Sequence, residues 1–165
     1  MLRPAPKRPD PSVGVMSVHV YESSIGWSGS TGAGYASYSR DHRITLGEST
    51  LTTSADPAFH GDAHLPNPEQ LLLAAASSCQ MLSFLGAAAR AGVDVLDYRD
   101  DATAIMPTDS RPMRITRIVL SPTVTVRESD DNTVHRLMHD AHSRCFIANT
   151  ITAAVELDIT VEVAA

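Results

Sequence analysis

The fold of this chain is decided by the stretch NPEQLLLAAASSCQMLSFLGAAARAG, residues 67–92, which we predict to form one long helix. Asn67 is a good N-cap, because its side-chain oxygen can accept hydrogen bonds from the first-turn amides. Pro68 suits the first helical position, where a missing N–H costs nothing. Gly92 supplies the residue that left-handed C-terminal caps prefer.

Nineteen consecutive residues of this helix, 71–89, carry no charge. A helix that is apolar on every side either spans a membrane or lies buried inside a domain. Six of these residues are Ser, Gln, Cys or Gly and six are Ala, so the Leu and Phe residues barely offset the cost of inserting the polar ones. We therefore expect a buried central helix. Cys79, near its midpoint, should then lie inside the protein.

Length, charge and cysteine content narrow the class of protein. A chain of 165 residues with 43% hydrophobic residues is long enough for one domain with a substantial core. The formal net charge of −6 argues against nucleic acid or an anionic membrane as partner. No secretion signal is recognisable, so two cysteines suggest redox-active or inert thiols more than a structural disulfide. We expect a cytoplasmic protein.

The rest of the chain is predicted to be a short tail and a single domain. Residues 1–14, with four prolines and no apolar period, are expected to be a disordered or loosely packed tail, and residues 15–165 the domain. A Gly/Ser-rich segment at 28–34 is expected to be a hairpin loop, and 47–66 a long irregular loop. Strands are expected at residues 15–21, 35–39, 42–46, 93–106, 113–127 and 151–163.

A second helix is expected to begin at the capping residues 128–131. Its apolar positions fall within about 100° of one another on a helical wheel; they are Val134, Leu137, Met138, Ala141 and Cys145. Cys145 should therefore point to the core. The order of elements predicts an α+β fold, an antiparallel sheet with two helices on one side.

Three residues stand out chemically: Cys79, Cys145 and Glu69. Buried cysteines are usually inert, and burial in an apolar helix should raise the pKa of Cys79 unless a cation or helix N-terminus stabilises its thiolate. Cys79 lies too far into its helix for the dipole to help. Arg40, at a predicted turn, is the candidate cation, although it can equally be a solvated surface residue. Glu69, roughly 15 Å from Cys79 along the axis, cannot touch the sulfur but can hold an arginine.

A second arrangement of possible ligands lies on the second helix. His135, His139 and His142 share a face, and imidazole with the Cys145 thiolate would suit zinc. Cys145, however, sits about 60–100° away from that face, inside the apolar stripe. We therefore favour an exposed polar flank over a metal site.

The NPEQLL run, Cys79 and a second cysteine 66 residues later at Cys145 resemble the OsmC/Ohr family of thiol peroxidases over roughly residues 33–163. The resemblance implies an intertwined homodimer, with long central helices packed between two sheets and active sites at the dimer interface. It implies that Cys79 attacks the peroxide and Cys145 resolves it, while Glu69 holds an arginine that activates the thiolate. Arg40 is the best match for that arginine, and Arg43 is the nearby competitor.

The chain also departs from the family pattern. Members commonly have proline after the second cysteine, whereas this chain has Phe146, which suggests a less-studied OsmC-like branch. The expected function is reduction of organic hydroperoxides, with hydrogen peroxide as a further candidate, through a Cys79 sulfenic acid and a Cys79–Cys145 disulfide. An external dithiol or lipoyl-type reductant would recycle the enzyme, and no cofactor or metal is expected. The alternatives are a non-catalytic ligand-binding or redox-sensing module on this fold, and a His/Cys metal-binding protein.

Overall fold

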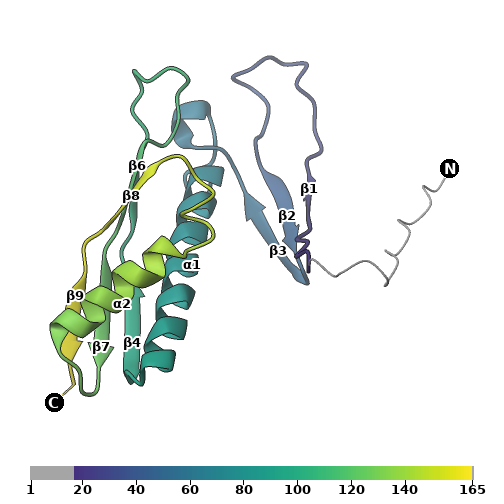
Figure 1. Cartoon of the computed structure of the whole chain (residues 1–165). Coiled ribbons are helices and arrows are strands. Elements are labelled where there is room, and N and C mark those ends of the chain that lie inside the picture. Colours follow the sequence, from purple (N-terminus) through teal and green to yellow (C-terminus); the bar gives the residue numbers. More distant parts are fainter. Residues whose placement is uncertain (1–16, 165) are drawn as a thin grey trace.

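The computed structural model describes residues 17–164, so the predicted tail at 1–14 lies outside the described residues. Within 17–164 the elements follow one another as shown in Figure 1: β1 (Ser23–Gly26), β2 (His42–Leu46), β3 (Ser49–Thr53), the 3-10 helix η1 (Pro57–Phe59), α1 (Pro68–Ala91), β4 (Val95–Asp100), β5 (Thr103–Ile105), β6 (Arg117–Leu120), β7 (Pro122–Val126), α2 (Asp131–Ser143), β8 (Ala154–Leu157) and β9 (Thr160–Val163). The α+β class with two helices is confirmed.

The predicted long helix is confirmed with its caps. The Asn67 side chain accepts a hydrogen bond from the Gln70 N–H, and the Gln70 side chain accepts one from the Asn67 N–H. This reciprocal pair satisfies two of the amides that a helix start leaves unpaired. Gly92 ends the helix with φ of 75°, a left-handed conformation that costs glycine little. Because Gln70 makes the return bond, the Glu69 carboxylate is not used in the cap.

Within one chain, α1 is covered along only one face. Its buried residues recur every four positions and form a single stripe: Ala76, Gln80, Phe84 and Ala88. Leu82, by contrast, is 62% exposed, and Leu72 is 37% exposed. The expectation of a helix buried on every side is therefore wrong for the single chain, because its own second helix and sheets contact only one side of it.

Among residues 17–164, α1 is the one helix whose length and apolar character would allow it to cross a membrane. The same test is passed by the central helices of soluble proteins. Here α1 packs against α2, β4 and β5.

The two long strands predicted after α1 are each broken in two. β4 pairs with β7 and β5 with β6, both antiparallel, instead of forming one continuous hairpin. The last predicted strand is likewise divided into β8 and β9, which pair in parallel with β6 and β7. The result is two three-stranded sheets, ordered β4-β7-β9 and β5-β6-β8. The parallel pairs arise because the chain returns to the sheets through the α2 crossover.

The break between the two sheets is tied to α1. Pro122 opens β7 and has no N–H to donate, so the ladder is interrupted just before it. At this point the Asp100 carboxylate accepts hydrogen bonds from the Ser121 N–H, at 2.7 Å, and from the Ser77 hydroxyl of α1. Pro122 begins the central strand of its sheet. Asp100 thus anchors α1 two residues before Cys79.

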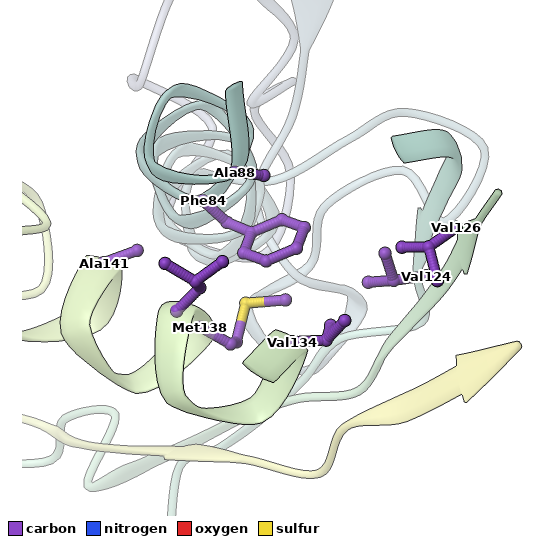
Figure 2. Packing of buried hydrophobic residues seen from close by; sticks show 8 residues of the cluster. Phe84, Ala88, Val124, Val126, Val134, Met138 and Ala141 are labelled. Carbon is purple, nitrogen blue, oxygen red and sulfur yellow. The ribbon is translucent and has the colours of Figure 1, made fainter. Parts of the chain in front are cut away.

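Two buried clusters lie along α1, on either side of Cys79. The first, shown in Figure 2, joins α1 to α2 and β7 and contains Phe84, Ala88, Val124, Val126, Val134, Leu137, Met138 and Ala141. The second contains Ala76 of α1 with Ile118 and Leu120 of β6. All four helical residues of the predicted apolar face of α2 are buried, as expected. This packing fixes how α2, and the turn that follows it, meet the middle of α1.

The N-terminal strands form a separate antiparallel sheet, ordered β1-β2-β3, which stands apart from the helices in Figure 1. Residues 28–34 lie in the loop joining β1 and β2, as predicted. Two strand predictions and one loop prediction fail here. The described part of the strand predicted at 15–21 is irregular, residues 35–39 form turns, and β3 lies inside the predicted loop at 47–66. The aromatic residues at 35–39 do not form a strand because two of their rings pack around Arg40.

Candidate active site

The structure brings Cys79 and Cys145 together. Cys79 lies in the middle of α1 and is partly exposed, whereas Cys145 lies just beyond the end of α2 and is completely buried. Both are free thiols, and they lie close enough for each to shift the pKa of the other. The prediction that Cys145 points to the core is confirmed. The pair has the proximity that disulfide formation requires, with only one sulfur open to a substrate.

The two thiols differ in acidity. Burial works against the Cys79 thiolate, yet the pKa of Cys79 is lowered, because its sulfur accepts hydrogen bonds from the backbone N–H groups of Ile147 and Phe146 and from the side chains of Cys145 and Ser83. The pKa of Cys145 is raised by its burial and by the neighbouring Cys79. Cys79 is therefore the thiol that ionises first, and Cys145 keeps its proton. Main-chain amides thus lower this pKa within one chain, a source of stabilisation that the residue pattern does not reveal.

These amides are held in place by a tight turn over residues 145–151. The Asn149 side-chain amide donates to the carbonyl oxygens of Ser143 at 3.1 Å and Cys145 at 2.9 Å. The Asn149 backbone N–H also donates to the Cys145 carbonyl, at 3.0 Å. The Thr150 hydroxyl donates to the Phe146 carbonyl at 2.7 Å. The turn is thus fastened at both ends, and its middle faces Cys79.

Cys79 opens onto a groove of about 640 Å³ between α1 and the end of α2. The walls near the sulfur are mainly apolar and include Leu82, Ala87 and the exposed ring of Phe146. Arg90 and Arg144 also line it. Such a site, apolar with a few polar groups and one acidic thiol, suits a small organic substrate.

Arg40 and Glu69, the other two predicted site residues, are not brought together within one chain. The Arg40 guanidinium donates to the carbonyl oxygens of Tyr38 and Tyr35, and lies 4.0 Å and 4.9 Å from the centroids of the same two rings. Among residues 17–164, no ion pair joins Arg40 to Glu69. Glu69 instead lines a separate groove of about 500 Å³ with Leu72. The roles assigned to Arg40, to its competitor Arg43 and to Glu69 remain predictions.

The histidines of α2 do not form a metal-binding cluster. In the part of the chain that the structure describes, no group of three His, Cys, Asp or Glu side chains is placed to hold a metal ion. His135 lies 3.6 Å from Asp131, and the His142 ring is hydrogen-bonded at 3.1 Å to the side-chain oxygen of the buried Gln80. His142 therefore links α2 to α1, whereas His135 pairs with Asp131 of its own helix.

Sequence reasoning missed several residues around Cys79: Ser83, Arg90, Arg144, Phe146, Ile147 and Asn149. The amide donors of Phe146 and Ile147 cannot be recognised from residue type, because every residue except proline has a backbone N–H. The only available hint was that phenylalanine replaces the usual proline at position 146. The site is thus built largely from main-chain groups that side-chain patterns do not reveal.

Known proteins resemble this chain in both sequence and fold. A family model described as OsmC-like protein matches residues 60–160. An OsmC-like protein of unknown function from Vibrio cholerae is 28% identical, with a TM-score of 0.78 over 86% of this chain and 99% of that one. The uncharacterized protein YmaD of Bacillus subtilis is 24% identical over 124 residues, 73% of this chain and 83% of that protein. An organic hydroperoxide resistance protein from Elizabethkingia anophelis shares the fold, with a TM-score of 0.66 at 14% identity over 91% of this chain and all of that one.

Proposed function

This chain belongs to the OsmC-like family, and from that premise we propose that it is a cysteine-based peroxidase that reduces organic hydroperoxides to alcohols. The observation that carries the proposal is the thiol pair: a partly exposed Cys79 with a lowered pKa beside a buried Cys145 with a raised pKa. The apolar groove beside Cys79 favours organic peroxides over hydrogen peroxide. Some proteins with this fold are named organic hydroperoxide resistance proteins.

The reaction uses the different acidities of the two thiols. The Cys79 thiolate attacks the distal oxygen of the peroxide, the O–O bond breaks, and the alkoxide leaves as an alcohol after taking up a proton. Cys79 is then a sulfenic acid. The Cys145 sulfur attacks it, forms the Cys79–Cys145 disulfide and releases water. An external dithiol, of which a lipoyl group is one example, reduces the disulfide by two exchange steps. These steps require no metal or organic cofactor.

We propose further that the working unit is a homodimer. Leu82 on α1 and Ile25 on β1 are among the large apolar side chains that a single chain leaves exposed, at 62% and 68%. Apolar surface of this kind is typical of an interface. In the dimer Arg40, or its competitor Arg43, adds a positive charge near Cys79 that Glu69 orients. A cytoplasmic location fits an enzyme whose thiols must be reduced again after each turnover.

The test is consumption of peroxide in the presence of dithiothreitol. We expect turnover of cumene hydroperoxide and fatty-acid hydroperoxides, slower turnover of hydrogen peroxide, and none by Cys79→Ser. Intact mass after one equivalent of peroxide should show the loss of two hydrogens that marks a disulfide.

Two outcomes would contradict the proposal. If no peroxide is consumed and the mass does not change, the cysteines are inert and the fold serves as a ligand-binding module. If the mass changes without turnover under any dithiol, the protein is a redox sensor. Metal analysis of the purified protein tests the remaining alternative.

A further inference from the structure

The turn after Cys145 presents several backbone N–H groups toward the two sulfurs. The N–H groups of Phe146 and Ile147 lie close enough to the Cys79 sulfur to lower its pKa, and those of Ala148 and Ile147 act in the same direction on the Cys145 sulfur. Within residues 17–164, none of these three N–H groups has a backbone carbonyl as acceptor, although the N–H groups on either side of them, at 145 and 149, do. Consecutive N–H groups that converge in this way form an anion-binding concavity.

We infer that this concavity is the built-in activator of the Cys79 thiolate, with the Phe146 and Ile147 amides as donors and Asn149 as the positioning residue. The inference rests on the proposed function, in which Cys79 must ionise to react. It adds a source of activation that lies within one chain and needs neither Arg40 nor a second subunit.

The helix that carries Cys79 cannot supply this stabilisation itself. Cys79 lies well inside α1, where the backbone N–H groups are already bonded to carbonyl oxygens of the preceding turn. The favourable end of the helix dipole acts only within about the first turn. Donors must therefore come from another segment, and the turn at 146–148 is the segment against the sulfur.

Asn149 holds the amides in position. Its side-chain amide bridges the carbonyl oxygens of Ser143, the last residue of α2, and Cys145. This bridge fixes the direction in which the chain leaves the helix and so fixes the turn that follows. Asn149 therefore acts on Cys79 through the amides of that turn.

Phe146 has a role that its side chain does not explain. Its ring is 80% exposed and lines the groove, while its N–H is a donor to Cys79. Members of the OsmC/Ohr family commonly have proline at this position. Proline has no N–H, so it would remove one of the donors to the Cys79 sulfur. The phenylalanine therefore gives this chain one more donor to the thiolate than a Cys-Pro sequence can offer.

The experiment compares Phe146→Pro with Phe146→Ala. Both variants lose the ring, but only the proline variant loses the N–H. The readout is the rate of Cys79 alkylation by iodoacetamide against pH, measured without peroxide in a Cys145→Ser background. We expect Phe146→Pro to raise the apparent pKa of Cys79 by about one unit relative to Phe146→Ala, and so to slow alkylation at pH 7 by up to about tenfold.

Two further variants guard against misfolding of the proline variant. Phenyllactic acid in place of Phe146 keeps the ring and changes only the N–H to an ester oxygen, so it should raise the pKa of Cys79 to a similar extent. Asn149→Ala should raise it by less, because the amides stay present but lose their fixed direction. Thermal unfolding identifies variants that have lost the fold.

The outcomes separate this inference from the proposed function. If the phenyllactate protein and Asn149→Ala are both folded and give the same Cys79 pKa as the wild type, the amides do not activate the thiolate. This conclusion holds whatever the peroxidase activity is. If the pKa rises as expected in a protein that consumes no peroxide, the concavity is supported and the peroxidase proposal fails. A pKa that changes equally in Phe146→Ala and Phe146→Pro would assign the effect to the ring and overturn the inference.

Discussion

The two halves of the chain meet very different physical demands. From α1 to β9 the chain builds its own core, and residues from α1, β7 and α2 such as Phe84, Val124 and Met138 are completely buried. In the N-terminal sheet only Ile44 of β2 and Thr53 of β3 are buried, while Ile25 of β1 is 68% exposed and Tyr21, just before β1, is 89% exposed. The first region builds a core within one chain, although one face of α1 stays exposed, whereas the second buries almost none of its own side chains.

The predicted catalytic residues are divided between the same two regions. The region from α1 to β9 positions both cysteines and the amides that acidify one of them. The N-terminal region carries Arg40, whose guanidinium is bound by its own loop. A thiol pair can thus be assembled by one chain, whereas any contribution from Arg40 depends on how the N-terminal sheet is placed on a partner. The following predictions test that division, from the largest effect to the smallest.

The first prediction concerns the two thiols of the region from α1 to β9. Cys79→Ser should abolish peroxide turnover, because the other thiol at the site, Cys145, is completely buried and its pKa is raised. Cys145→Ser should still react once with peroxide and then stall as a sulfenic acid, detectable by intact mass and dimedone labelling. Equal multiple-turnover rates for wild type and Cys79→Ser would place the chemistry elsewhere.

The second prediction compares stability between the regions. Phe84→Ala should lower the free energy of unfolding by about 3–5 kcal/mol, because it leaves a cavity among α1, α2 and β7. Ile25→Ala should leave the free energy of unfolding of the separated chain unchanged to within about 0.5 kcal/mol, because Ile25 lies on the exposed sheet.

The matching measurement for Ile25 is the oligomeric state. Light scattering at micromolar concentration should give twice the chain mass of 17.7 kDa, and Ile25→Ala should weaken the dimer by about tenfold if it lies in the interface. A wild-type mass near that of one chain would show that the N-terminal sheet is exposed in solution and would end the dimer proposal.

The third prediction asks whether Arg40 reaches Cys79 in the assembled protein. A guanidinium within about 4–6 Å of a thiolate favours ionisation, so Arg40→Met should raise the pKa of Cys79 by about one unit. Glu69→Gln should raise it less, and should add little to Arg40→Met, because residues that act through one another are not additive. Alkylation rates against pH measure all four proteins. Superimposable wild-type and Arg40→Met curves would move the role to Arg43.

The smallest expected effect is the pH dependence of the contact between α1 and α2. Burial, together with the neighbouring His139, lowers the pKa of His142 below its ordinary value of 6.5. The folded state then binds fewer protons than the unfolded state, so the stabilising contribution is full above pH 6.5 and is lost as the pH falls through the lowered value. His142→Gln should flatten this slope in urea unfolding measured between pH 7 and about 5. An unchanged slope would assign it to other groups.

Local patterns predicted the helices well and the strands poorly. The caps at Asn67 and Gly92 and the apolar face of α2 depend on neighbours within a few residues, so their spacing was enough. The strand predicted at 35–39 failed because Tyr35 and Tyr38 pack around Arg40, a contact that no alternation rule describes. The strands after α1 were found, but their division at Pro122 depends on how two sheets join.

The candidate site shows the same limit more sharply. The resemblance to the OsmC/Ohr family implied that Cys79 and Cys145 form a pair, whereas the residue pattern predicted a raised pKa for Cys79 in the absence of a cation. The acidifying groups are the amides of Phe146 and Ile147. They could not be foreseen, because the direction of a backbone N–H depends on the turn that Asn149 closes.

By itself, the sequence determined that residues 67–92 form one helix, uncharged over 71–89, with a thiol near its middle. It also determined that a second helix buries one face and that a second thiol follows it. These features follow from residue type and spacing, which act over one or two turns. Tertiary structure decided which thiol is the acidic one, which face of α1 stays exposed, and where Arg40 lies. Those outcomes depend on contacts between segments far apart in the chain, where helix packing sets which atoms meet and which are excluded from water.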